Sequence, residues 1–91
     1  MNKDKITYTY LFKSYNNLYK IGKTQNLANR TNTLLNGNPD LEYITHIEGD
    51  FERELKKLLK PFHYKREFYC LDEENYLSLI EYFFERNILK Q

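Results

Sequence analysis

Hydrophobic and polar residues alternate near the start of the chain, from residue 6 to residue 13. Successive side chains of a strand point to opposite faces, so the four bulky residues at even positions share one face. They are Ile6, Tyr8, Tyr10 and Phe12. Residues 14–17 are polar and include two adjacent asparagines, which tolerate left-handed backbone and suit a tight connection. We therefore expect residues 18–23, LYKIGK, to return as an antiparallel strand beside the first.

A helical spacing follows this hairpin. Apolar residues recur at intervals that place them on one helix face, beginning after Thr24 or Asn26, either of which can cap the helix. The face consists of Leu27, Thr31, Leu34 and Leu35. We expect it to pack against the sheet, while Arg30 leaves the helix near the sheet's edge.

Residues 41–48 alternate once more and predict a third strand, which ends at Gly49 and Asp50. One predicted face carries Leu41, Tyr43, Thr45 and Ile47, and the other carries Glu42, Ile44, His46 and Glu48. The two-residue period thus places Leu41 and Ile47 on the same side of the sheet.

A second helix is predicted over residues 51–60, FERELKKLLK, with Asp50 as its cap. A rotation of about 100° per residue gathers four apolar side chains on a stripe that we expect to be buried. They are Phe51, Leu55, Leu58 and Leu59, and the opposite face carries Arg53, Lys56, Lys57 and Lys60. Glu52 and Glu54 lie on the two borders between these faces, and only Glu52 shares its border with Lys56. The helix geometry therefore favours Glu52 as the site carboxylate.

The last third of the chain predicts a short strand and a long helix. Pro61 ends the second helix, and residues 68–71 form a short apolar strand. Asp72 then caps a helix that runs to about Asn87, with two glutamates in its first turn. Its wide apolar arc, which we expect to close the core, consists of Tyr76, Leu77, Leu79, Ile80, Phe83 and Phe84.

Together these elements predict an α+β domain over residues 1–91, in which a small, mainly antiparallel three-stranded sheet is packed by three helices. A chain of 91 residues can bury a single modest core. The single Cys70 excludes an internal disulfide, and its apolar strand indicates an inert core thiol. His46 and His63 lack the spacing of a zinc site, so we expect both to be structural.

No apolar run reaches the length of a membrane span, and the N-terminus lacks the hydrophobic region of a signal peptide. We therefore expect a cytoplasmic protein with no membrane partner. The net charge is only +1, which argues against coating nucleic acid by bulk electrostatics. Residues 1–36 carry six lysines and arginines against one aspartate, a net +5, whereas residues 37–91 carry eight against twelve acidic residues, a net −4. A phosphate-bearing substrate should approach the basic first half, with binding that is weak and sensitive to salt.

The tripeptide YTY, a short turn, YKIGKT, NLANR and a later glutamate occur in this order along the chain. Their order and spacing resemble the GIY-YIG nuclease superfamily, in particular its compact phage and viral branch, over about residues 6–71. The resemblance places Tyr10 at the tyrosine of the first motif. It places Lys20 at the tyrosine position of the second motif, with Tyr19 one residue earlier, as in the YKIG form of the compact branch.

The same resemblance carries the family's helix arginine onto Arg30 and its metal-binding glutamate onto Glu52. Lys56 stands one helical turn after that glutamate, where the family often has a basic polar residue. Glu67 and Phe68 resemble the acidic-aromatic start of the branch's closing strand.

The resemblance implies a metal-dependent endonuclease that hydrolyses phosphodiester bonds in DNA with one Mg²⁺ or Mn²⁺; RNA stays open as a substrate, and so does a homodimer. Tyr10 would accept a proton from the attacking water if Lys20, Arg30 and the metal lower the phenol pKa from about 10. Arg30 would meet the non-bridging oxygens and Glu52 would hold the metal. The candidate catalytic residues are Tyr10, Tyr19, Lys20, Arg30 and Glu52, and the candidate substrate contacts are Lys20, Lys23 and Lys56.

Each of these residues also has a structural interpretation. With nine tyrosines in the chain, a tyrosine on a strand commonly packs in the core, and Glu52 could simply pair with Lys56 on the helix surface. A module that keeps the fold but has weak or no catalysis, and uses its basic face to bind nucleic acid or a host protein, is one alternative, favoured by Lys20 in the second motif. A module that docks another protein through exposed tyrosines is another.

Overall fold

The computed structural model describes residues 5–90, with only the backbone at residues 89 and 90. Its elements, in chain order, are strands β1 (Tyr8–Lys13) and β2 (Leu18–Thr24), helix α1 (Leu27–Gly37), strand β3 (Glu42–Glu48), helix α2 (Glu52–Leu58), a 3₁₀ turn (Lys60–Phe62), strands β4 (His63–Lys65) and β5 (Phe68–Cys70), and helix α3 (Glu73–Lys90). The α+β class and the three helices predicted from the sequence are confirmed.

The sheet has five strands in the order β3-β1-β2-β5-β4, and all its neighbouring strands are antiparallel. The prediction of three strands was therefore wrong. The strand without a sequence signal is β4, whose three residues are all exposed and show no apolar periodicity. It forms a hairpin with β5 at the sheet edge, so tertiary pairing rather than local pattern determines it.

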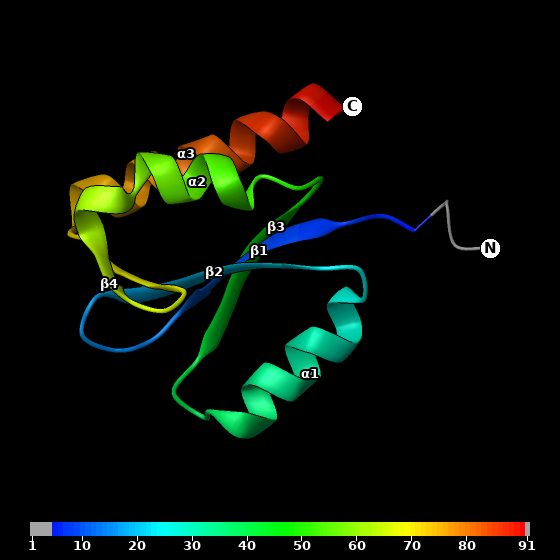
Figure 1. Cartoon of the computed structure of the whole chain (residues 1–91), viewed down its shortest axis with the longest axis horizontal. Coiled ribbons are helices and arrows are strands. Elements are labelled where there is room, and N and C mark those ends of the chain that lie inside the picture. The colour runs from blue at the N-terminus through cyan, green and yellow to red at the C-terminus, as the bar shows by residue number, and fades with distance from the viewer. Residues whose placement is uncertain (1–4, 91) are drawn as a thin grey trace.

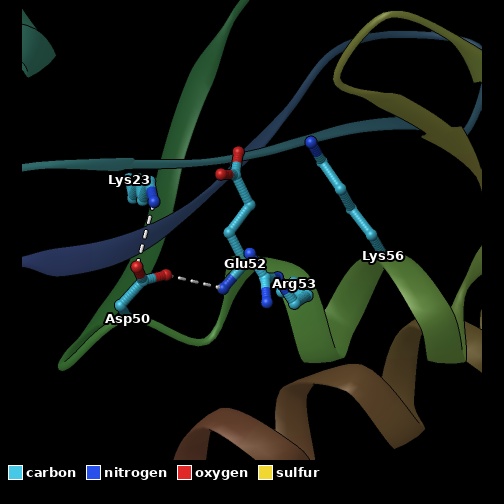
Figure 2. Close-up of a pocket in the computed structure, with 5 residues that line it drawn as sticks. All are labelled: Lys23, Asp50, Glu52, Arg53 and Lys56. Atoms are coloured by element: carbon cyan, nitrogen blue, oxygen red, sulfur yellow. Dashed lines mark hydrogen bonds and ion pairs between the residues drawn. The ribbon is translucent and has the colours of Figure 1, made fainter.

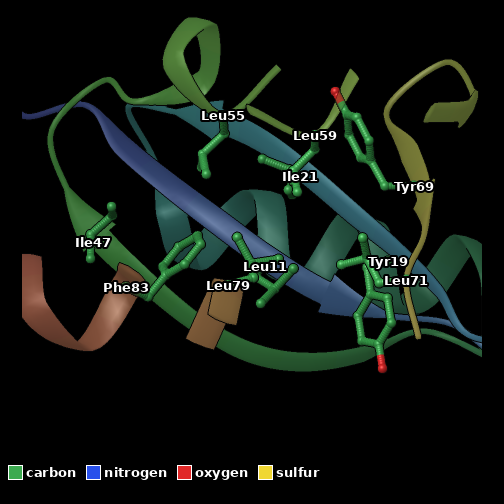
Figure 3. Packing of buried hydrophobic residues seen from close by; sticks show 10 residues of the cluster. All are labelled: Leu11, Tyr19, Ile21, Ile47, Leu55, Leu59, Tyr69, Leu71, Leu79 and Phe83. Carbon is green, nitrogen blue, oxygen red and sulfur yellow. The ribbon is translucent and has the colours of Figure 1, made fainter. Parts of the chain in front are cut away.

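Helices cover both faces of the sheet: α1 lies on one side, and α2 and α3 lie together on the other (Figure 1). The core is correspondingly divided into two clusters. Tyr10, Phe12 and Leu41 form the smaller one beneath α1. The larger one, beneath α2 and α3, contains Leu11, Tyr19, Ile21, Ile47, Leu55, Leu59, Tyr69, Leu71, Leu79 and Phe83 (Figure 3).

Strand β1 lies in the middle of the sheet between β2 and β3, and its alternating side chains enter both clusters. Tyr10 and Phe12 face α1 with their rings edge to face at 5.5 Å, whereas Leu11 faces α2 and α3. The buried Thr9 hydroxyl donates to the Gly49 carbonyl (2.8 Å) and accepts from the Phe51 amide (2.9 Å). These bonds fasten the start of α2 to the central strand.

Local signals predicted several boundaries correctly. Asn16 and Asn17 adopt the left-handed backbone expected for the β1–β2 connection, with φ of 60° and 61°. Of the two candidate caps of α1, Asn26 accepts from the Asn29 amide at 3.1 Å. Asp72 likewise accepts from the Asn75 amide at the start of α3 (2.8 Å).

Strand β3 departs from the strict alternation predicted for it. Its register with β1 shifts between Leu11 and Phe12, which pair with Thr45 and Tyr43, so Ile44 is an extra residue. Such a bulge changes which face the following side chains occupy. Leu41 consequently packs beneath α1 and Ile47 beneath α3, on opposite faces instead of the same one.

Four predicted core residues are exposed. Leu58, Leu77 and Phe84 face outward from α2 and α3, because Leu55, Leu59, Leu79 and Phe83 already fill the side toward the sheet. Cys70 is a free, exposed thiol, because Tyr69 and Leu71 on either side of it take the buried positions. Along residues 5–90, no helix combines the length and the apolar character needed to cross a bilayer.

Candidate active site

The candidate site lies at the edge of β2, where its pairing with β5 ends. Strand β5 pairs with Leu18–Lys20, and the last bond of this edge runs from the Ile21 amide to the Glu67 carbonyl (3.1 Å). Gly22 is the next residue. Side chains from α1, α2 and the β4–β5 hairpin approach this edge from both faces of the sheet.

Tyr10 reaches the edge from the α1 face by lying across Gly22, its partner in the β1–β2 ladder. A Cβ built on Gly22 would come within 2.3 Å of the Tyr10 hydroxyl oxygen, so only glycine leaves room for the phenol. Tyr10 and Gly22, from the two motifs, are thus in direct contact, although they are twelve positions apart in the sequence. Tyr10 itself is almost fully buried, with 1% of its surface exposed.

The electrostatic surroundings of Tyr10 differ from those expected. Burial and the nearby Glu67 carboxylate, with a smaller contribution from Glu52, raise the pKa of Tyr10 to about 12. Arg30 acts in the opposite direction and lowers this pKa. The expectation of a lowered phenol pKa was therefore wrong for the protein alone: Tyr10 holds its proton at neutral pH. The same charges show that Glu67, Arg30 and Glu52 all lie within electrostatic reach of its hydroxyl.

Glu52 belongs to a cleft of about 550 Å³ on the α2 side of this edge, lined by Lys23, Asp50, Glu52, Arg53 and Lys56. The Glu52 carboxylate and the Lys56 ammonium both extend from α2 toward β2 (Figure 2). Asp50 is held by Lys23 at 2.9 Å and accepts from the Glu52 amide at 3.3 Å. Among residues 5–88, the Glu52 carboxylate has no hydrogen bond or ion pair, so it is available to a ligand.

Glu54, the other border carboxylate of α2, has a structural role. It accepts a hydrogen bond from the Tyr82 hydroxyl and pairs with Arg86 at 3.7 Å, which ties α2 to α3. The structure thus directs Glu52 toward the candidate site and Glu54 away from it, as the helix geometry predicted.

Lys20 is committed to an ion pair. Its ammonium lies 2.9 Å from the Glu67 carboxylate and 5.1 Å from the centre of the Phe68 ring, with only 15% of the side chain exposed. As Lys20 and Gly22 share the α1 face, this pair lies on the same side of the sheet as Tyr10. Lys20 therefore pairs with Glu67, one of the carboxylates that raise the Tyr10 pKa, and its ammonium is not free for substrate.

Tyr19 does not join this group. Its side chain faces the opposite side of the sheet, where it is buried in the larger cluster and stacks on Tyr76 with ring centres 4.7 Å apart. The alternation of β2 makes this unavoidable, because Lys20 and Gly22 occupy the Tyr10 side. Arg30, by contrast, is exposed on α1 and does act on Tyr10.

Tyr69 is a member of the site that was not among the predicted residues. Burial raises its pKa, and Glu52 and Glu67 raise it further, so its phenol is a neutral donor close to both carboxylates. Its hydroxyl points out of the larger cluster (Figure 3). Strand alternation could have found this residue. Tyr69 follows Phe68 on β5, so its side chain must lie on the opposite face of the sheet, which is the face that α2 and Glu52 cover.

Similarity to a known family covers almost the whole chain. Residues 5–84 match the T5orf172 domain. The chain belongs to the T5orf172 domain family. This domain is associated with phage-type endonuclease modules, a coarser relation than the GIY-YIG superfamily suggested by the motifs. No curated protein and no solved structure matched the chain.

The T5orf172 match spans every element that carries the candidate site, from β1 to most of α3. It includes Tyr10, Arg30 and Glu52, which the structure brings to one edge, as well as Tyr19, which it does not. Family membership thus supports a nuclease-like or DNA-binding module as the general function.

Proposed function

We propose that this T5orf172 domain is a metal-dependent endonuclease that hydrolyses phosphodiester bonds in DNA. The observation that carries the proposal is that Arg30 of α1 and Glu52 of α2 both act electrostatically on Tyr10 of β1, whose hydroxyl lies against Gly22 of β2. A phenol can position water, a guanidinium can stabilise charge on a phosphate, and a carboxylate can hold a metal, and phosphodiester hydrolysis can use all three around one phosphate.

The donors of the cleft fit a hard divalent cation. Within the part of the chain that the structure describes, no cluster of three or more His, Cys, Asp or Glu side chains is arranged to hold a metal. Mg²⁺ and Mn²⁺ need no such cage, since they bind through one or two carboxylates, water and substrate phosphates. Glu52 would supply that carboxylate, and the bound cation would stabilise negative charge on the phosphate and the leaving oxygen.

Tyr10 would position the attacking water. Its phenol is protonated at neutral pH, so the hydroxyl oxygen can accept a hydrogen bond from water while its proton is donated to a phosphate oxygen. If the phenol takes the proton of the water as it passes its own to the phosphate, no free phenolate is needed. Arg30 would donate to the non-bridging oxygens, where negative charge increases in the transition state.

The lysines of the site differ in what they can contribute. Lys56 extends into the cleft beside Glu52 without an ion pair within the described residues, so it would contact phosphate directly. Lys23 would do so by exchanging its bond to Asp50. We assign Lys20 to positioning and charge balance through Glu67, and we assign Tyr19 to packing.

A DNA-binding module without strong catalysis is the second candidate. The raised pKa of Tyr10 favours it, because a phenol that holds its proton is a poor general base. In this alternative the same cleft would hold the phosphate backbone, and the loss of Glu52 would leave the affinity intact.

Cleavage of supercoiled plasmid and of single- and double-stranded oligonucleotides, in Mg²⁺, Mn²⁺ and EDTA, distinguishes the two candidates. Metal-dependent cleavage should fall by about 10²–10³-fold in Glu52→Gln and Arg30→Gln, and substantially in Tyr10→Phe. Glu54→Gln and Lys57→Gln are the matched controls, since neither residue lies in the cleft. Cleavage that survives EDTA or Glu52→Gln would contradict the endonuclease mechanism. Binding without cleavage by the folded wild type would establish the second candidate instead.

A further inference from the structure

A second cleft adjoins the first and has a different charge character. It measures about 450 Å³ and is lined by Lys56, Lys60, His63, Arg66 and Tyr69. Lys56 lines both clefts, so the two are neighbours on either side of one side chain. The first cleft contains two carboxylates among its lining residues, whereas the second contains none. A site lined by cations and neutral donors selects an anion.

The cations of the second cleft have no acidic partners. Within residues 5–88, the ion pairs involve Lys20, Lys23 and Arg86, and none involves Lys56, Lys60 or Arg66. Solvated lysines on a surface are common and by themselves carry little meaning. Here three cationic side chains face one concave space together with the neutral Tyr69 phenol, which can donate to the same anion.

Arg66 lies in the turn that closes this cleft. It occupies the β4–β5 turn with φ of 52°, a left-handed conformation that favours glycine or asparagine and is costly for other residues. His63 holds this turn through a 2.6 Å bond from its Nε2 to the Arg66 carbonyl. The backbone there would be less strained with asparagine or glycine, and the Arg66 side chain lines the second cleft.

We propose that this second cleft binds a backbone phosphate of the same nucleic acid strand, next to the phosphate in the Glu52 cleft. The proposal rests on the proposed function, because it takes the ligand to be a nucleic acid. It adds the path of the strand, from Lys23 and Glu52 across Lys56 to Lys60 and Arg66. These contacts would position the strand without reading its bases.

The test is equilibrium binding of fluorescent single- and double-stranded oligonucleotides to the full chain in EDTA, at several salt concentrations, by fluorescence anisotropy. Arg66→Asn removes the cation but suits the left-handed turn, so it should not lose thermal stability. It should weaken binding by roughly five- to tenfold and reduce the slope of log affinity against log salt by about 1. Lys60→Gln should act in the same direction, and Arg66→Lys should restore part of the affinity.

Lys57→Gln is the control, because it removes the same charge from α2 but lines neither cleft. Equal affinity and salt slope in Arg66→Asn, Lys60→Gln and Lys57→Gln would overturn the proposal, as would the absence of any binding to nucleic acid. The readout is separate from cleavage. If the protein cleaves DNA but its affinity does not depend on Arg66 or Lys60, the endonuclease proposal stands and the second phosphate site is wrong. If affinity depends on Arg66 but no DNA is cleaved, the second phosphate site stands and the endonuclease proposal is wrong.

Discussion

The hydroxyl of Tyr10 occupies the space that a side chain on Gly22 would fill, and this close approach joins the YTY segment of β1 to the YKIG segment of β2. A Cβ on Gly22 would lie 2.3 Å from the hydroxyl oxygen and 2.5 Å from Cζ of the ring. Gly22 is not among the residues with positive φ, so space rather than backbone freedom requires glycine there. The position of the phenol at the site edge therefore depends on a missing side chain in the neighbouring strand.

Gly22→Ala should displace the Tyr10 ring and damage both stability and activity. Because Tyr10 is buried among packed residues, the added methyl group should lower the free energy of unfolding by about 1–3 kcal/mol. It should also reduce cleavage, since the hydroxyl moves away from Glu52 and Arg30. Urea denaturation and the plasmid assay measure the two effects.

Gly37→Ala is the matched control for that variant. Gly37 ends α1 and does not adopt a positive φ, and a Cβ added there would meet no other atom within 4 Å. Alanine at this position should be neutral or stabilise the protein by up to about 1 kcal/mol. Equal losses of stability at the two glycines would show that steric contact with Tyr10 is not the cause.

The stability of the protein should fall at alkaline pH through its buried tyrosines. The pKa values of Tyr10 and Tyr82 are raised to about 12, chiefly by burial, from about 10 in the unfolded chain. A raised folded pKa means that the unfolded state loses protons first, so stability is fully present below about pH 10 and is lost progressively up to about pH 12. Tyr10→Phe should flatten part of this decline. Urea titrations at neutral pH and at values between about 10 and 12 test it, and an unchanged pH profile in Tyr10→Phe would contradict the assignment.

The two border carboxylates of α2 should respond oppositely to the same substitution. Glu52→Gln should change the free energy of unfolding by less than about 0.5 kcal/mol, because its carboxylate has no hydrogen bond or ion pair within residues 5–88. It should lower metal-dependent cleavage by about 10²–10³-fold. Glu54→Gln should lower the free energy of unfolding by about 1 kcal/mol, because it weakens the contacts to Tyr82 and Arg86. Its cleavage activity should be unchanged.

Chemical denaturation together with the cleavage assay separates these two roles. An unstable Glu52→Gln variant would mean that the carboxylate supports the fold. Its loss of activity could then be due to unfolding and would not show that Glu52 takes part in the reaction. Loss of cleavage in a fully folded Glu54→Gln variant would instead identify Glu54 as a carboxylate that the reaction needs.

The sequence predicted the parts of the fold that local chemistry determines. Adjacent asparagines defined the hairpin turn, Asn26 and Asp72 capped their helices, and the borders of α2 separated Glu52 from Glu54. The bulge at Ile44 could not be predicted in this way, because it arises from pairing with β1 rather than from the composition of β3. Strand β4 was missed for a similar reason: its three exposed residues gain their order only from β5.

At the candidate site, motif order pointed to Tyr10, Arg30 and Glu52 as candidates but could not give their surroundings. The pKa of Tyr10 depends on its burial and on Glu67, which comes from a distant hairpin. For Tyr19 the prediction grouped a residue with the site because it is adjacent to Lys20 in the sequence. Adjacent residues of a strand point to opposite faces, so Tyr19 lies on the other face of β2 from Lys20 and Gly22. Strand alternation alone would have separated Tyr19 from Tyr10 once the ladder partner of Tyr10 was known to be Gly22.

Leu77 and Leu79 of α3 provide the sharpest test of which helix face closes the core. Leu79 is 4% exposed within the larger cluster, whereas Leu77 is 57% exposed, although both belong to the apolar arc that the sequence predicted to be buried. Leu79→Ala should leave a cavity beneath the helix and cost about 2–4 kcal/mol, which in a domain of this size approaches the whole stability. Leu77→Ala should cost less than about 0.5 kcal/mol, because its side chain is already in water. Urea denaturation of both variants measures these two changes in the free energy of unfolding. If Leu77→Ala destabilises the protein as much as Leu79→Ala, the outer face of α3 is covered in solution.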